Sequence, residues 1–165
     1  MCYIRAGIRM GVLLECMLVF AAALLAQSQL KLNPHLDYNS DSVDGPLITG
    51  NDTETGVVAG KPNYVMIYGE GCFNSKRQAR RTVALSGRYG DKVNFVIIDL
   101  DKPQSPAQLK LVQTYYGGSI PDLVVLDSNG KPVYNRAGEQ SEEVLSHILD
   151  TALQQTTQGM EQERH

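Results

Sequence analysis

The sequence predicts an α/β domain with a central mixed β-sheet, in which parallel strands are followed by a C-terminal antiparallel hairpin and helices flank the sheet. Two observations predict it. Apolar, β-rich runs at 64–68 and 93–98 each precede a longer helix-forming segment. Two further runs, 122–127 and 131–135, are separated by Ser-Asn-Gly, which is typical of a hairpin turn. Strands that alternate with helices pair in parallel through right-handed crossovers, so we expect one sheet covered by helices.

The first predicted elements lead to a junction flanked by glycines. Residues 46–49 form a short expected strand, and residues 64–68 form a clearer one, bounded by Gly69 and Gly71. The stretch 74–88 contains no proline and is rich in helix formers. We therefore expect a strand that passes directly into a helix.

The next predicted unit repeats this order, and its helix carries signals at both ends. Residues 93–98 are almost continuously apolar, which is typical of a strand covered on both faces and favours a central place in the sheet. Ser105 is a favourable N-cap, Pro106 suits the first helical position, and the glycines at 117–118 mark the helix end.

The hairpin and a last helix complete the predicted domain, which spans 46–155. Pro132 places the second hairpin strand at an edge of the sheet, because proline cannot donate to a ladder. Ser141 caps the final helix, whose apolar face runs along 144–153. The polar residues 156–165 are expected to form a disordered tail.

Residues 1–26 have the pattern of a signal peptide. Arg5 and Arg9 precede an apolar run at 16–26 that is short for a membrane span but suits a signal-peptide core. Cleavage after Ala26 would leave an extracytoplasmic protein, either periplasmic or secreted.

The alternatives at the N-terminus are an uncleaved anchor and a true start at Met10. Membrane contact is expected only through this segment, cleaved or not. The polar stretch 27–45 that comes next has no apolar periodicity, so it predicts a flexible lead to the domain.

Charge and cysteine content narrow the function classes. The formal net charge of −3 provides no basic field for nucleic acid, so none is expected as a partner. The chain has three cysteines, and Cys2 and Cys16 would leave with the signal peptide. The remaining Cys72 then has no internal partner, which points to a reactive thiol, to a homodimer linked through Cys72, or to a small buried side chain.

Four features resemble the thioredoxin family over residues 60–155. They are the segment Gly-Cys-Phe-Asn-Ser-Lys at 71–76, the Asp-Leu-Asp end of a strand at 99–101, the pair Ile120-Pro121 before the hairpin, and Gly138 after it. The family motif reads Trp-Cys-Gly-Pro-Cys-Lys. The resemblance implies a thioredoxin-like fold and an activity on protein or small-molecule thiols and disulfides.

The resemblance also assigns roles to individual residues. Cys72 takes the place of the nucleophile, Ser75 that of the second cysteine, and Pro121 that of a cis-proline. In the family, the residue before this proline pairs its backbone with the substrate, which makes Ile120 a candidate contact. The remaining candidates for substrate binding are Phe73 and Asn74.

The residues themselves predict the chemistry of the site. A cysteine just ahead of a helix faces unpaired N–H groups and the positive end of the helix dipole, which favour the thiolate. Lys76 and Arg77 add positive potential, while Glu70 opposes them. The Ser75 hydroxyl can donate to the thiolate but cannot form a disulfide, so release of a mixed disulfide must await an outside thiol.

Other departures from the family weaken proton transfer. Met66 stands at the family's buried acid, Ile97 at the lysine usually paired with it, and Gly71 at the tryptophan before the motif. We therefore expect monothiol exchange through Cys72, serving redox homeostasis, disulfide isomerisation or partner retention.

Two alternatives remain open: a redox-inactive module that binds peptides or proteins, and a monothiol glutaredoxin with an iron–sulfur cluster. The second fits poorly, because no glycine follows Cys72. No cofactor or metal is expected, since the histidines are scattered without ligand spacing. They are His35, His147 and His165.

Overall fold

The computed structural model describes residues 30–43, 45–50 and 56–162. β3 and β4 of its main sheet run parallel, whereas β5 is antiparallel to β3 and β6 to β5. This confirms the predicted mixed sheet with its parallel pair and C-terminal hairpin. The strands, in the spatial order β4-β3-β5-β6, are β3 (Asn63–Tyr68), β4 (Asn94–Asp99), β5 (Asp122–Leu126) and β6 (Pro132–Ala137).

β4 lies at one end of the four described strands, which corrects the central position expected for residues 93–98. The strand is nevertheless buried on both faces. Phe95 and Ile97 join the hydrophobic cluster on one face, while Val96 and Ile98 join the cluster on the other. Its continuous apolar sequence therefore reflects coverage from above and below, and not a strand on each side.

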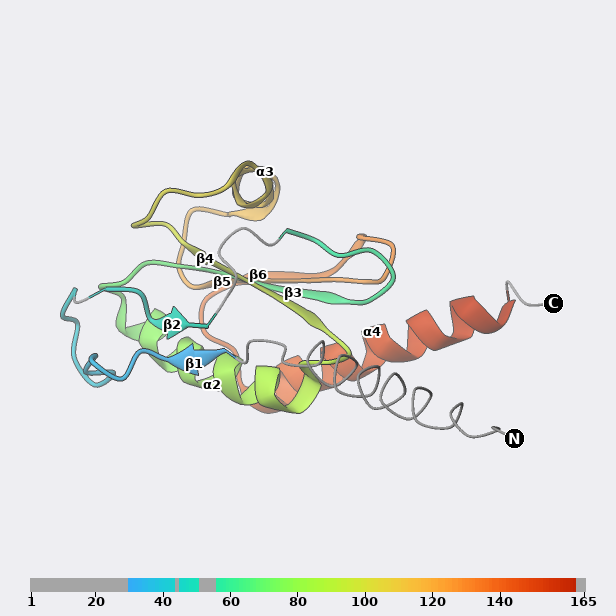
Figure 1. Ribbon diagram of the computed structural model, residues 1–165, viewed down its shortest axis with the longest axis horizontal. Coiled ribbons are helices and arrows are strands. Elements are labelled where there is room, and N and C mark those ends of the chain that lie inside the picture. Colours follow the sequence, from blue (N-terminus) through green and yellow to red (C-terminus); the bar gives the residue numbers. More distant parts are fainter. Residues whose placement is uncertain (1–29, 44, 51–55, 163–165) are drawn as a thin grey trace, which may run out of the picture.

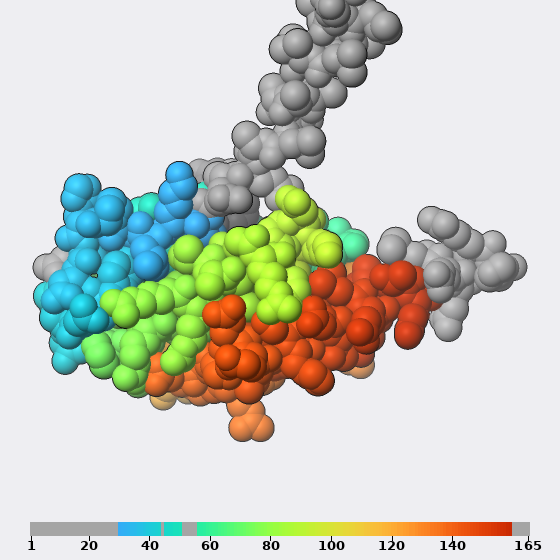
Figure 2. Space-filling model, turned by 90° about the horizontal axis from the view of Figure 1, so that it is seen from below, coloured from blue at the N-terminus to red at the C-terminus, as the bar shows by residue number. Residues whose placement is uncertain are grey.

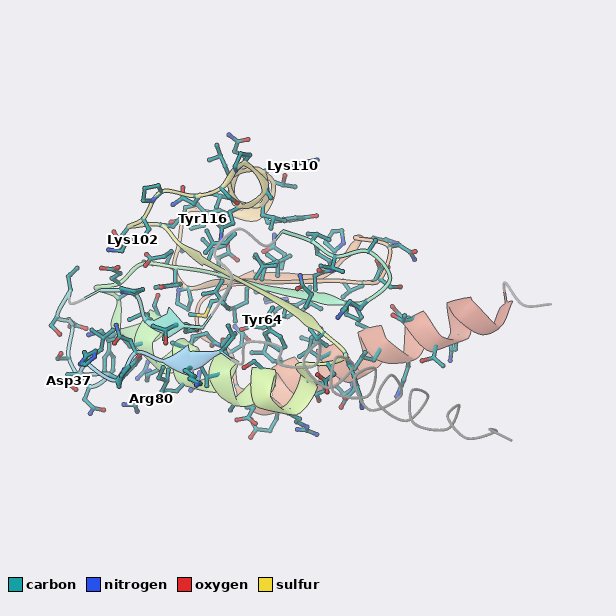
Figure 3. All side chains as sticks on the ribbon, viewed as in Figure 1. Asp37, Tyr64, Arg80, Lys102, Lys110 and Tyr116 are labelled. Atoms are coloured by element: carbon teal, nitrogen blue, oxygen red, sulfur yellow. The ribbon has the colours of Figure 1, made fainter. Side chains whose placement is uncertain are left out.

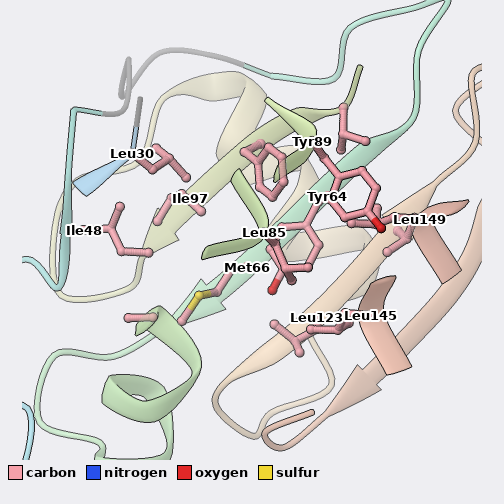
Figure 4. Packing of buried hydrophobic residues seen from close by; sticks show 14 of the residues in the cluster. Leu30, Ile48, Tyr64, Met66, Leu85, Tyr89, Ile97, Leu123, Leu145 and Leu149 are labelled. Atoms are coloured by element: carbon pink, nitrogen blue, oxygen red, sulfur yellow. The ribbon is translucent and has the colours of Figure 1, made fainter. Parts of the chain in front are cut away.

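Side chains of β3 alternate between these two clusters, as the period of a strand requires. Tyr64 and Met66 enter the cluster shown in Figure 4, while Val65 and Ile67 enter the other. Figure 1 shows the layers that result: α3 covers one face of the sheet, and α2 and α4 cover the opposite face. The helices are α2 (Phe73–Tyr89), α3 (Pro106–Tyr115) and α4 (Glu142–Gln162).

The start of α3 confirms the predicted cap. The Ser105 hydroxyl accepts a hydrogen bond from the main-chain N–H of Gln108 at 3.3 Å, and the Gln108 side chain accepts one from the Ser105 N–H at 3.1 Å. Pro106 occupies the first helical position, as expected. This reciprocal pair is a capping box, which satisfies two donors that the helix itself leaves free.

The hairpin between β5 and β6 also agrees with the prediction. Gly130 in its turn has a φ of 79°, a left-handed conformation that glycine adopts without strain. The Asp127 carboxylate accepts hydrogen bonds from the N–H groups of Asn129 and Lys131, each at 2.9 Å. Pro132 begins β6, the strand at the other end of the four described strands.

The segment before the main sheet differs from the flexible lead predicted for 27–45. Its described part packs on the face that carries α2, where β1 (Lys31–Leu32) pairs antiparallel with β2 (Ile48–Thr49). Figure 2 shows this segment, in blue, beside α2 in green. Tyr38 and Leu47 are buried, and the Tyr38 hydroxyl donates to the Leu47 carbonyl. Isolated apolar side chains therefore fix the segment although they show no periodic pattern.

The C-terminus differs from prediction too. α4 continues to Gln162, whereas a disordered tail was expected over 156–165. No proline interrupts this stretch, and the hydroxyls of Thr156 and Thr157 bond to carbonyls four residues earlier in the helix. Polar sequence thus lengthens the helix beyond the point where its apolar face ends.

The predicted signal peptide, residues 1–26, lies outside the described residues. Within the described ranges, no helix combines the length and the apolar character that crossing a membrane requires. Localisation therefore remains a prediction from the sequence.

Candidate active site at the start of helix α2

Cys72 occupies the N-cap of α2, at the junction where β3 gives way to the helix. Its backbone is extended, with φ −93° and ψ 119°, and its N–H donates to the Gly69 carbonyl at 3.3 Å. Its own carbonyl accepts the first helical hydrogen bond, from the Lys76 N–H at 3.0 Å. The side chain is half-buried, and Cys72 is the one cysteine within the described residues. The thiol therefore lies at the positive end of a 17-residue helix.

Ile120 and Pro121 lie beside this thiol, as the sequence predicts. The Cys72 Sγ atom is 3.8 Å from the Ile120 carbonyl oxygen, and the Ile120-Pro121 bond is cis. Pro121 is buried, and its carbonyl accepts a hydrogen bond from the Gly138 N–H at 2.7 Å. The structure thus joins three separate features of the sequence: the cysteine motif, the proline and the glycine after the hairpin.

Ser75 lies one helical turn after Cys72 and is fully buried. Its hydroxyl oxygen has no hydrogen-bond partner among the described residues. A buried hydroxyl without a partner costs free energy, so no hydrogen bond among the described residues accounts for a serine here. The group remains available to donate to a thiolate formed next to it.

Lys76, expected to support the thiol electrostatically, directs its ammonium group elsewhere. The residue is fully buried, and Nζ lies 2.9 Å from the Asp37 carbonyl oxygen and 2.8 Å from that of Ser42. Nζ also lies 3.3 Å from the Ser42 hydroxyl. The charge therefore holds the N-terminal segment against α2, a role that the sequence did not indicate.

Arg77 is also engaged by other groups. Its guanidinium forms a two-pronged ion pair with Glu139, at 2.6 and 2.8 Å, and lies 4.7 Å from the centre of the Phe73 ring. Asn74 is exposed, and its side-chain oxygen accepts a hydrogen bond from Arg77 at 2.9 Å. Phe73 and Asn74 thus contact Arg77 at the start of α2, and Glu139 offsets the positive charge of Arg77.

Met66 and Ile97 are neighbours across the β3–β4 pair, both buried in the same cluster. They occupy the places of the acid and lysine that the thioredoxin resemblance associates with proton transfer. This part of the core is therefore apolar.

An acidic cluster on the other side of the junction was missed by sequence reasoning, which placed the strand-end carboxylates in solvent. Asp99 is half-buried and accepts a hydrogen bond from the Tyr68 hydroxyl at 3.0 Å. Glu70 is 4% exposed and pairs with Lys102 at 3.1 Å. Burial raises the pKa of Asp99 to about 6, and the nearby Glu70 adds to this rise. Asp101 is exposed, as expected.

The same cluster affects the Tyr68 hydroxyl and lines a cavity. Burial and the neighbouring Asp99 carboxylate raise the pKa of Tyr68 well above its ordinary value. A cavity of about 300 Å³ adjoins both side chains, between β2 and the end of β4. Within the described residues, no group of three or more His, Cys, Asp or Glu side chains is placed to hold a metal ion.

Sequence comparison finds two named relatives. The chain is 26% identical over 141 residues to the thiol:disulfide interchange protein TxlA of Synechococcus elongatus, covering 86% of this chain and 72% of that protein. It is 32% identical over 108 residues to the TxlA homolog of Synechocystis sp., covering 66% of this chain and 54% of that protein. The chain has a thioredoxin-like fold. It is distantly homologous to these TxlA proteins, and no family model matches it.

Solved structures with a similar arrangement are less similar to this chain in sequence. A thioredoxin-like protein from Clostridium perfringens has a TM-score of 0.49 and 20% identity, covering 58% of this chain and 73% of its own. The germline thioredoxin Deadhead of Drosophila melanogaster has a TM-score of 0.45 and 23% identity, covering 55% and 80%. The thioredoxin-like fold of the chain rests on its own strand order and helix placement.

Proposed function

We propose that this chain carries out thiol–disulfide interchange through Cys72 by a monothiol mechanism. One observation carries the proposal. The Cys72 sulfur lies at the start of α2 beside the Ile120 carbonyl, while the residue one turn later is Ser75, which has no thiol. Homology to two proteins named for thiol:disulfide interchange supports the class of reaction.

The proposed step is an exchange in which atoms and electrons balance. The Cys72 thiolate attacks one sulfur of a disulfide, a new S–S bond forms, and the old one breaks with its electron pair leaving on the second sulfur as a thiolate. No net oxidation occurs. Because Ser75 cannot attack the new bond, a thiol from outside the chain must release the partner.

The partners and the location belong to the same proposal. We expect protein or small-molecule disulfides as partners. A Cys72-linked homodimer forms when the Cys72 thiolate of a second chain attacks the mixed disulfide on Cys72 of the first, and the partner leaves as a thiolate. The signal-like residues 1–26 support an extracytoplasmic site of action, periplasmic or secreted. Export with cleavage predicts a mature chain that starts at Gln27, which N-terminal sequencing of the secreted fraction checks.

The test is capture of a disulfide-bonded protein. A full-length chain with Cys2 and Cys16 replaced by serine is reduced, mixed with insulin, quenched by alkylation and separated without reductant. We expect a covalent complex that a reductant dissolves and that the Cys72→Ala variant does not form. Absence of a complex and of any new insulin thiol would contradict the proposal.

A redox-inactive binding module is the second candidate, and the buried, apolar Met66–Ile97 pair favours it because it offers no proton-transfer group. The same variants distinguish the two functions. If the chain is a binding module, the Cys72→Ala variant binds its partners with unchanged affinity. If the chain is an exchange protein, a covalent complex survives denaturing conditions with the wild type and is absent with the Cys72→Ala variant.

A further inference from the structure

Val43 is the most exposed large hydrophobic side chain of the described residues, with 67% of its surface open to solvent. It lies on the N-terminal segment and contacts Gly71, the residue before Cys72. A Cβ atom added to Gly71 would be 2.7 Å from Val43 Cγ2 and 3.8 Å from the Asp41 carbonyl oxygen. Gly71 therefore leaves room for a valine from a distant part of the chain.

A second glycine makes room in the same way for the other side of the site. A Cβ atom on Gly69 would be 2.7 Å from the terminal methyl of Ile120. Val43 and Ile120 thus lie against the two glycines that precede Cys72. Together with the half-buried Phe73, the residue after Cys72, they place apolar side chains beside the segment that carries the thiol.

The segment that carries Val43 is anchored to α2 at several points. The buried Lys76 ammonium binds the carbonyl oxygens of Asp37 and Ser42 at 2.9 and 2.8 Å. Arg80 lies 5.6 Å from the centre of the Tyr38 ring. In Figure 3, Asp37 and Arg80 lie on the α2 side of the sheet. Val43 is therefore held in place despite its exposure.

We infer that Val43 is a specificity-determining residue, which contacts an apolar side chain next to the reacting cysteine of a partner protein. The inference rests on the proposed exchange function. Exposing an isopropyl group to water is unfavourable, and a partner chain seated beside Ile120 would cover it. The preferred partner segment is then one with leucine or a similar residue beside its disulfide-bonded cysteine.

The experiment uses two short peptides that differ only in the residue beside their single cysteine, leucine in one and serine in the other. Each cysteine is joined to thionitrobenzoate as a mixed disulfide. Attack by the Cys72 thiolate on the peptide sulfur forms the Cys72–peptide disulfide and releases the coloured thionitrobenzoate anion. The protein is the full chain with Cys2 and Cys16 replaced by serine, and dithiobis-nitrobenzoate serves as a probe without a peptide.

With the wild type, we expect the leucine peptide to react faster than the serine peptide. With the Val43→Ser variant, we expect the rate for the leucine peptide to be about fivefold lower. The same variant should leave the rates with the serine peptide and with dithiobis-nitrobenzoate unchanged. Val43→Leu should keep the preference. Val133→Ser is the matched control. Val133 is also exposed, at 41%, and it lies in β6 near the pairing of Leu126 with Asn63. That is the end of the sheet opposite the one where β3 leads to Cys72.

Three results would overturn the inference. Equal rates for the two peptides with wild-type Val43 would show no selection. A Val43→Ser variant that reacts faster with every probe would make Val43 a cover over the thiol. A wild-type chain that reacts with no probe would contradict the exchange function itself, and the inference with it.

Discussion

The sulfur of Cys72 lies 3.8 Å from the carbonyl oxygen of Ile120, although the two residues are 48 positions apart in the sequence. The thiol comes from the start of a helix, and the carbonyl comes from the turn before β5. A partner chain that pairs with the backbone at Ile120 would hold its own sulfur near Cys72. In the proposed mechanism, this arrangement would position the partner, and Ser75 would limit the reaction to a single exchange.

Replacing Ser75 by cysteine should add the missing step. The new thiol would lie one turn from Cys72 and attack the mixed disulfide from within the chain, so it acts at a high effective concentration. With dithiothreitol as electron donor, we expect insulin reduction to accelerate about tenfold or more. Ser75→Ala is the control and should show no such acceleration. Equal rates for all three proteins would indicate that release does not limit turnover.

Removing the buried cation should destabilise the fold. Lys76→Met takes three charge-assisted contacts from the oxygens of Asp37 and Ser42. We expect the free energy of unfolding in urea to fall by about 2 to 3 kcal/mol. Arg77→Met removes a part-exposed ion pair and should cost only about 0.5 kcal/mol. Similar losses for both variants would contradict the anchoring role of Lys76.

The raised pKa of Asp99 predicts a pH dependence with a definite sign. Its folded-state pKa is about 6 against an ordinary 3.8, so the folded chain holds the extra proton between these values. Stability is therefore lost as the pH rises through this window. Asp99→Asn removes this titration. As the pH rises from about 4 to about 7.5, we therefore expect the free energy of unfolding of this variant to increase by about 1 kcal/mol relative to that of the wild type.

Urea unfolding at both pH values measures this difference. The Asp101→Asn variant is a suitable control, because that carboxylate is exposed. A stability gain that does not change with pH would contradict the assignment to Asp99.

Two glycines, one before the α2 N-cap and one within the helix, should respond oppositely to alanine. At Gly71 the new Cβ would meet Val43 at 2.7 Å, so we expect destabilisation of about 1 kcal/mol and a weaker preference for the leucine peptide. At Gly87, within α2, nothing lies within 4 Å of a new Cβ. There alanine should stabilise by about 0.5 to 1 kcal/mol through its helix propensity. Urea titrations measure the stability of both variants, and the peptide assay measures the preference. A loss of stability in both variants would contradict the predicted opposite response.

A structural feature could be predicted from the sequence where it depends on residues that are close together along the chain. Ser105 with Pro106 at the start of α3 is such a feature, since a capping residue acts within one turn. The approach of Ile120 to Cys72 was expected from the resemblance to a known family. The Lys76 contacts could not be predicted, because main-chain carbonyls 34 and 39 positions away have no side-chain signature.

The acidic cluster was missed for a related reason. A carboxylate at a strand end is normally solvated, whereas Asp99 lines a cavity that it shares with residues of β2. That segment was expected to be a short strand, but its antiparallel partner in β1 lay within the predicted flexible lead. Local pattern identified the strand and carried no information about its neighbour.

The lifetime of a mixed disulfide at Cys72 tests the central claim most directly. A peptide thiol is joined to Cys72 in the full chain that keeps Cys2 and Cys16 as reduced thiols, and in the chain that lacks them. Free peptide is measured over time with and without added glutathione. We predict that the bond persists without glutathione and is released by it, with the same behaviour in Ser75→Ala. Release without glutathione from the chain that keeps Cys2 and Cys16, but not from the chain that lacks them, would show that the chain resolves its own disulfide, which would contradict a monothiol mechanism.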